Sequence, residues 1–176
     1  MRVAYFDCFS GIAGDMVLGA FIDAGLDIKY LSRELKKLGL KGYELNKSKV
    51  RRGGLIGTKF SVVVDPEQLG HTHRRLGGIL KIIEKSSLNR RVKDISKRIF
   101  EIIGEVEAKI HGIADKNDLV LHELGGIDSI IDIVGAAIAF DKFEIGEIYS
   151  SSMHFGRTLI DTKHGVLPAP SPAALE

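Results

Sequence analysis

The sequence predicts an α/β protein, with one mixed sheet of about five strands and helices packed on it in a single domain. Short apolar runs alternate along the chain with longer segments whose apolar residues recur every three or four positions. The first pattern predicts strands and the second predicts helices. The chain has 176 residues, 44% of them hydrophobic. That length and composition suit one domain with a substantial core.

The chain opens with a strand and two helices. Residues 2–6 predict a short buried strand, and a glycine-bearing loop leads from it into a helix over residues 15–24, which Gly25 ends. A second helix is predicted over residues 29–38, because its leucines recur at steps of four and three, and Gly39 ends it.

A hairpin and two further helices follow. Residues 43–50 and 55–64 are extended runs joined by two arginines and two glycines, which predicts a β-hairpin with a basic tip. Beyond it, helical periodicity dominates residues 76–84 and 92–110, where isoleucine and valine keep a three- to four-residue step. Gly112 ends the longer helix.

The last third predicts two short strands around an apolar helix. Residues 119–121 and 145–149 are the strands, and Asp128 is placed to cap a helix that ends near Phe140. We expect the loops after the first strand and after residues 119–121 to open on the same edge of the sheet, where ligands bind in open α/β folds.

The C-terminal residues predict a helix that only begins. Ser171 followed by Pro172 is a helix-start signal, yet four residues remain after it, and one turn does not sustain a helix. We therefore expect the parent protein to continue into a further C-terminal domain. Residues 1–165 are predicted to form the α/β domain, and residues 166–176 an extended proline-rich segment leading onward.

Charge and composition exclude several classes of protein. Lys and Arg number 25 against 23 Asp and Glu, a formal net charge of +2, so nucleic acid is not an expected partner. The single cysteine, Cys8, excludes an internal disulfide and fits a reducing cytoplasm. The longest apolar tract, residues 130–140, contains Asp132 and is far shorter than the roughly 20 residues that span a bilayer, so no membrane is expected.

A first candidate site lies at the junction of the first strand and helix. Asp7, Ser10, Gly11, Gly14 and Asp15 stand there, and free N–H groups at a helix start can bind a phosphate. The two carboxylates could instead hold a divalent ion that neutralises a phosphate. The alternative is a tight turn in which the second aspartate only caps the helix.

A second candidate site runs from His122 to Asp132. His122 and Glu123 follow a strand, while Asp128 and Asp132 are one helical turn apart and share a face. The helix around them is apolar nearly all round, so a carboxylate buried there needs a cation or several donors. A metal or catalytic role competes with structural capping near the positive end of the helix.

Histidines elsewhere give weaker signals. His71 and His73, followed by Arg74, could chelate a metal or lie in a solvated loop. On the long helix, Glu107 and His111 are four residues apart, and capping explains them better than a site does. The basic hairpin tip could meet an anion, although such turns are usually only solvated.

Five motifs in order carry a resemblance to a known family. They are Asp7-Cys8-Phe9-Ser10-Gly11-Ile12-Ala13-Gly14-Asp15-Met16, His73-Arg74, Ile110-His111-Gly112, His122-Glu123-Leu124-Gly125-Gly126-Ile127-Asp128 with Asp132, and His164-Gly165 with the prolines after it. In this order they resemble the nickel-insertion proteins of nickel-pincer nucleotide biosynthesis. Members are usually about twice as long, so the chain is similar to their N-terminal part, and it has fewer histidines before His73-Arg74.

The resemblance implies a CTP-dependent enzyme that inserts Ni²⁺ into pyridinium-3,5-bisthiocarboxylic acid mononucleotide, with Mn²⁺ or Mg²⁺, to make the cofactor of lactate racemase. The implied partners are that mononucleotide, CTP, the further C-terminal domain and a possible second copy of the chain. The implied catalytic residues are Asp7, Asp15 and Glu123. The implied nucleotide-binding residues are Ser10, Gly11, Gly14 and Arg74. The implied metal ligands are His73, His111, His122, Asp128, Asp132 and His164. A metal-dependent nucleotide phosphohydrolase and a non-catalytic metal-binding scaffold stay open as alternatives.

Overall fold

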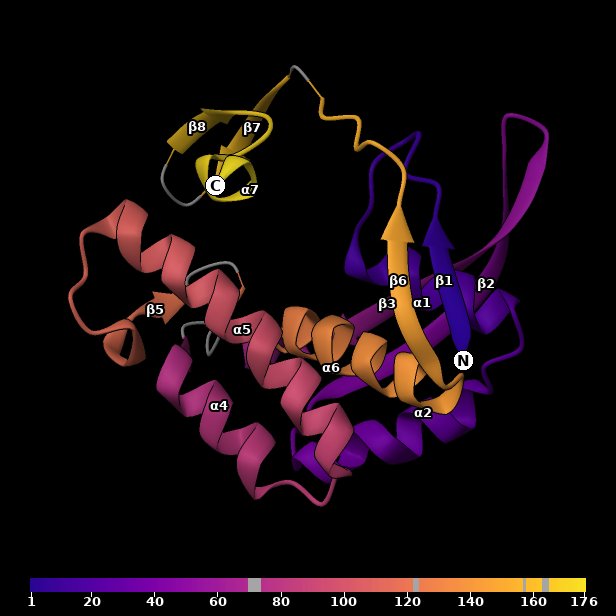
Figure 1. Cartoon of the computed structure of the whole chain (residues 1–176), viewed down its shortest axis with the longest axis horizontal. Coiled ribbons are helices and arrows are strands. Elements are labelled where there is room, and N and C mark those ends of the chain that lie inside the picture. Colours follow the sequence, from indigo (N-terminus) through magenta and orange to yellow (C-terminus); the bar gives the residue numbers. More distant parts are fainter. Residues whose placement is uncertain (70–73, 122–123, 157, 163–164) are drawn as a thin grey trace.

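The protein is a layer of helices flanked by small two-stranded sheets (Figure 1). The computed structural model describes residues 1–69, 74–121, 124–156, 158–162 and 165–176. The α-helices are α1 (Gly14–Asp23), α2 (Ile28–Leu35), α3 (Pro66–Leu69), α4 (Leu76–Lys85), α5 (Arg90–His111), α6 (Ile127–Lys142) and α7 (Pro172–Leu175). Short 3₁₀ turns lie at Lys36–Leu38 and Lys116–Asp118. Among the described residues, none of these helices is long and apolar enough to cross a membrane.

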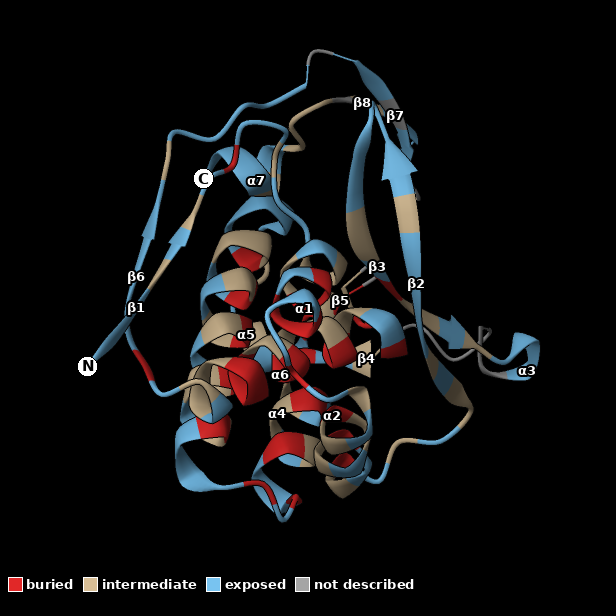
Figure 2. Ribbon diagram, turned by 90° about the vertical axis from the view of Figure 1, so that its right-hand side faces the viewer, coloured by how far each residue is buried: buried red, intermediate tan, exposed pale blue. Residues whose placement is uncertain are grey.

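Helix α6 is the centre of the core. It packs against α1, α2 and α5, and Figure 2 shows buried residues gathered on the helices while most strand residues are exposed. Ile130, Ile131 and Val134 of α6 are fully buried. The prediction that this helix is apolar nearly all round and buried is therefore confirmed. Its start differs from the prediction, because Gly126 is the N-cap and Asp128 lies in the first turn.

The strands form four pairs among the described residues, so the prediction of one five-stranded sheet is wrong although the α/β class is confirmed. The pairs are β1 (Arg2–Phe6) with β6 (Ile145–Ser150), β2 (Tyr43–Arg52) with β3 (Leu55–Val64), β4 (Arg74–Arg75) with β5 (Val120–Leu121), and β7 (Leu159–Thr162) with β8 (Gly165–Pro168). Only β1 and β6 run parallel. The β2–β3 pair is the predicted hairpin.

The expectation that the first strand and residues 119–121 end at the same edge of one sheet is also wrong. Strand β5 pairs antiparallel with β4 and not with β1. The Leu76 N–H donates to the carbonyl of Leu119, so this short ladder is fixed to the start of α4. A two-residue strand offers too few backbone bonds to build a sheet, and here it only tethers a helix start.

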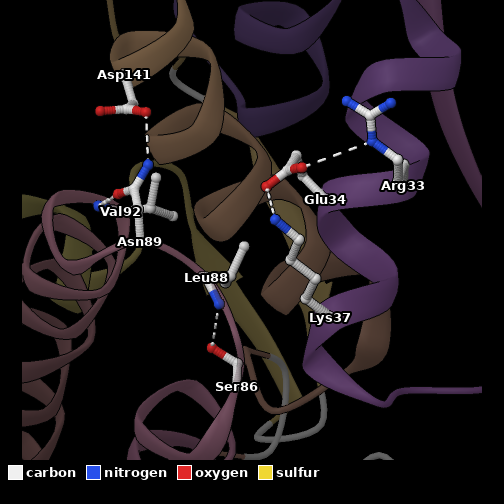
Figure 3. Close-up of polar contacts among 8 residues, drawn as sticks. All are labelled: Arg33, Glu34, Lys37, Ser86, Leu88, Asn89, Val92 and Asp141. Atoms are coloured by element: carbon white, nitrogen blue, oxygen red, sulfur yellow. Dashed lines mark hydrogen bonds and ion pairs between the residues drawn. The ribbon is translucent and has the colours of Figure 1, made fainter.

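Local polar contacts set the boundaries of α5 and join it to α6. Asn89 accepts a hydrogen bond from the Val92 N–H at 2.9 Å and so caps α5. Its amide donates to an Asp141 carboxylate oxygen at 2.7 Å, which links the start of α5 to the end of α6 (Figure 3). The Leu88 N–H donates to the Ser86 hydroxyl in the turn before it. These bonds hold the start of α5 beside the end of α6.

The C-terminal residues fold back onto α5. Helix α7 begins after Ser171 with proline in its first turn, which confirms the helix start predicted there. It packs near the last turns of α5, where Lys109 donates to Glu176 at 2.5 Å. Figure 1 shows β7, β8 and α7 together at this end of α5.

Candidate functional site

The start of α1 lies directly against the second turn of α6. A methyl group added at Gly14 would lie 2.5 Å from Cβ of Asp132, which is closer than side-chain atoms approach in folded proteins. One turn further along, an added methyl at Gly135 of α6 would meet Leu18 of α1 at 3.0 Å. Glycine at both contacts lets the two backbones come together. The sequence motif around Gly14 and the one around Asp132 therefore form one site.

Asp132 is the electrostatic centre of this site. The side chain is half-buried, and among the described residues its Oδ1 atom has no hydrogen-bond partner. Burial, together with the negative charges of Asp15 and Asp128, raises the pKa of Asp132 to about 7. The three carboxylates, which we call the acidic cluster, therefore interact. A cation placed there would relieve both the burial cost and the repulsion.

Two helix starts face the acidic cluster. Asp15 lies in the first turn of α1 and Asp128 in the first turn of α6. The N-caps Ala13 and Gly126 have no side-chain oxygen, so neither can accept from the first N–H groups of its helix. Helix starts carry a partial positive charge, which favours these acids and any anionic ligand group brought close by a metal.

The loop before α1 is held by the strand pair β1–β6. The Cys8 N–H donates to the Ser151 hydroxyl at 2.8 Å, and the Gly11 N–H donates to the carbonyl of Cys8. Gly11 has a φ of +84°, a backbone conformation that favours glycine. Asp7 and Ser10 are exposed on this loop. Ser151 was missed by sequence reasoning, because a serine within the run 150–152 gives no signal of such a contact.

An apolar cavity of about 330 Å³ opens beside the acidic cluster. It lies between the β1–β6 pair and helices α1, α5 and α6, and Asp132 forms part of its wall. Apart from Gly14 and Ser150, the other wall residues are apolar or aromatic, among them Phe6, Phe140, Tyr149 and Met153. Sequence reasoning missed this cavity, because residues from five separate segments build it.

The other described candidates lie apart from the acidic cluster. Glu107 and His111 are 3.3 Å apart on α5 and line a separate cavity of about 680 Å³ against the C-terminal segment. Arg74 of β4 donates to the carbonyl of Gly125, so it holds the loop that precedes α6.

Four candidates, His73, His122, Glu123 and His164, lie outside the described residues. Within the described ranges, no group of three or more His, Cys, Asp or Glu side chains has the arrangement of a metal site. The acidic cluster is thus a set of interacting carboxylates, and its role as a metal site stays a prediction.

The fold and this site define an α/β protein with an acidic site where two helices begin. Over residues 4–176 the chain matches the family model of the nickel insertion protein, and it belongs to that family. The resemblance predicted from the sequence is confirmed.

Curated relatives carry more specific names. A pyridinium-3,5-bisthiocarboxylic acid mononucleotide nickel insertion protein of Desulfitobacterium hafniense is 47% identical over 176 residues, which cover 100% of this chain and 43% of the relative. A protein of the same name from Acetivibrio thermocellus is 46% identical over 182 residues, covering 100% of this chain and 44% of the relative. The chain thus spans less than half the length of these relatives. No solved structure matches it.

Proposed function

We propose that this chain is the part of a nickel insertion enzyme that receives Ni²⁺ and presents it to a pyridinium mononucleotide. The observation that carries the proposal is the unpartnered Oδ1 of Asp132 inside the acidic cluster. The family membership and the names of the relatives supply the metal and the substrate. Nickel is here a substrate that passes through the site.

The ligand chemistry suits a metal that must leave again. Asp15, Asp128 and Asp132 offer hard oxygen donors, whereas Ni²⁺ prefers imidazole nitrogen. A carboxylate site therefore holds Ni²⁺ weakly enough to release it to the sulfur atoms of the substrate. His73, His111, His122 and His164 are proposed as the nitrogen ligands that bring the metal in. Asp7 and Glu123, together with Asp15, are proposed as the catalytic acids and bases.

A nucleotide role is proposed for the loop before α1. Ser10, Gly11 and Gly14 stand at an uncapped helix start, which suits the phosphates of CTP with Mn²⁺ or Mg²⁺. Arg74 is proposed to act with them by holding the loop before Asp128. The product would be the nickel cofactor of lactate racemase, with CTP hydrolysed during insertion.

Metal titration tests the proposal directly. We expect isothermal titration of this chain with Ni²⁺ and with Mn²⁺ to show binding that Asp132→Asn weakens by about tenfold or more. The matched control is Asp94→Asn, which alters an exposed aspartate on α5 that pairs with Arg90. Equal affinities for the native chain and the Asp132→Asn variant would overturn the metal role of the cluster.

An insertion assay separates this function from the alternatives. The chain, Ni²⁺, CTP, Mn²⁺ and the bisthiocarboxylate mononucleotide are mixed with and without the separately expressed C-terminal part of a relative. We expect a nickel-loaded product only with both parts. CTP turnover without nickel transfer would favour a phosphohydrolase, and metal binding with neither activity would favour a scaffold.

A further inference from the structure

We infer that the apolar cavity beside Asp132 binds the positively charged pyridinium ring of the mononucleotide. This inference rests on the proposed function and names the place of the substrate within the same site. It is carried by the shape, the lining and the charge of the cavity.

The cavity has the size and lining of a ring-binding pocket. Its volume of about 330 Å³ lies at the lower end of the range for small-molecule sites, roughly 300–1,000 Å³. Residues of the β1–β6 pair and of helices α1, α5 and α6 line it. A single aromatic ring is small enough for a space of this volume.

The charge of the lining selects a cation. Asp132 is the one ionisable acid or base in the described wall apart from the Tyr149 phenol. A cationic ring in an apolar space needs a nearby negative charge, which Asp132 supplies. The aromatic rings of Phe6, Phe140 and Tyr149 add attraction for a cation over their faces. A neutral ring of the same shape would gain the apolar contact and lose both electrostatic contributions.

The position of Asp132 joins the ring to the metal. Asp132 belongs both to the wall of the cavity and to the acidic cluster. A ring in the cavity would therefore carry its thiocarboxylate groups close to a Ni²⁺ ion held at the cluster. Without the metal, anionic sulfur would be repelled by three carboxylates. The arrangement thus favours metal binding before the bisthiocarboxylate substrate.

The test uses nicotinamide mononucleotide as probe, a pyridinium mononucleotide without thiocarboxylates. The control is its reduced dihydropyridine form, which keeps the phosphate and has an uncharged ring. We expect calorimetry with this chain to show binding of the oxidised probe about tenfold tighter than of the reduced one. Equal binding of both forms, or binding of neither, would overturn the inference.

Variants place the ring. Tyr149→Leu removes an aromatic ring from the cavity wall, and Ala136→Leu fills the cavity with a larger side chain. The control is Tyr5→Leu, because Tyr5 pairs with Tyr149 across the two strands but does not line the cavity. We expect the first two to weaken probe binding about tenfold and the third to leave it unchanged. Probe binding that none of them alters would show that the ring binds elsewhere.

Nickel titration of the same variants keeps the two proposals apart. Tyr149→Leu and Ala136→Leu should retain the Ni²⁺ affinity of the native chain, because neither residue belongs to the acidic cluster. Loss of probe binding with intact Ni²⁺ binding supports the inference. Intact probe binding with no effect of Asp132→Asn on Ni²⁺ would retain the ring pocket and reject the metal role of the cluster. A last experiment adds the C-terminal part of a relative to the chain before the probe. Loss of probe binding would show that protein fills the cavity in the longer enzyme, and it would overturn the inference.

Discussion

Helices α1 and α6 touch at two places that share a geometry and differ in chemistry. At one contact Gly135 of α6 receives Leu18 of α1, and at the other Gly14 of α1 receives Asp132 of α6. Leu18 is fully buried among apolar residues. Asp132 is half-buried with an unpartnered oxygen. The same packing of a side chain on a glycine thus closes the core at one contact and holds a carboxylate in place at the other.

The difference indicates that the Leu18–Gly135 contact stabilises the crossing of the two helices, whereas the Asp132–Gly14 contact supplies the chemistry of the site. Burying a leucine side chain stabilises the fold by about 1.5–3 kcal/mol. Burying a carboxylate without a partner has an energetic cost that folding does not recover. Functional sites often keep residues that lower the stability of the fold, and replacing such a residue can stabilise the protein.

The largest effect is expected at the apolar contact. Leu18→Ala should lower the free energy of unfolding by about 3 kcal/mol, because it removes buried methyl groups and leaves a cavity. Urea unfolding followed by circular dichroism measures the change. Met16→Ala, on an exposed position of the same helix, is the control and should change stability little. A loss below about 1 kcal/mol for Leu18→Ala would show that the crossing does not depend on this contact.

The two glycines give a matched pair with unequal effects. Gly14→Ala should destabilise by about 1–3 kcal/mol, because the new methyl meets Cβ of Asp132, which cannot turn away. Gly135→Ala should cost less, since the added methyl meets Leu18 at 3.0 Å, where a small shift of that side chain relieves the contact, and alanine favours a helix by about 1 kcal/mol. Thermal unfolding of both variants tests this order. Equal destabilisation by the two would remove the distinction between the contacts.

The acidic contact predicts a pH dependence. The pKa of Asp132 is about 7 in the folded protein and starts from 3.8. Between about pH 4 and pH 7, Asp132 is therefore protonated in the folded state and ionised in the unfolded state. The contribution of Asp132 to stability is complete below about pH 4 and is lost as the pH rises through about 7.

Asp132→Asn isolates this contribution, because the amide resembles the protonated carboxyl group. We expect its Tm to equal that of the native chain near about pH 4 and to exceed it near about pH 8. Calorimetric scans across this range measure the difference between the two proteins. A lower Tm for Asp132→Asn at both pH values would mean that the carboxylate is a structural acceptor.

The smallest effect is expected at the rim of the cluster. Asp128→Asn should lower the pKa of Asp132, because one of the negative charges that raise it is removed. The stability should change by less than about 1 kcal/mol, since the loss of a favourable charge at the helix start opposes the relief of repulsion. NMR titration of the Asp132 carboxyl carbon measures this pKa. A pKa unchanged by Asp128→Asn would show that the two carboxylates do not interact.

Sequence patterns predicted what is local in this fold. The three- to four-residue spacing of isoleucine in α5 and the apolar surface of α6 identified both helices, and the presence of Asp132 on a buried helix identified the central residue of the site. These features depend on neighbours within one or two turns. Helix periodicity and the cost of a buried charge are therefore enough to find them.

Contacts between distant segments could not be predicted in this way. Gly14 and Asp132 meet because α1 crosses α6, and no spacing within either segment indicates that crossing. The pairing of β1 with β6, and of β5 with β4, depends on which edges remain free once the helices have packed. The cavity beside Asp132 is a product of the same crossing. Sequence reasoning thus named the acids of the candidate site and missed the cavity.

The parallel pair β1–β6 also sets the order in which the chain can fold. Phe6 pairs with Ser150, so the N-terminal strand leaves the ribosome long before its partner is synthesised. At about 5–20 residues per second, the delay is on the order of ten seconds. During that time the edge of the first strand that later pairs with β6 has no partner, and such an unpaired edge can pair with another chain. Because its partner is so distant along the chain, the strand that is synthesised first is among the last to pair.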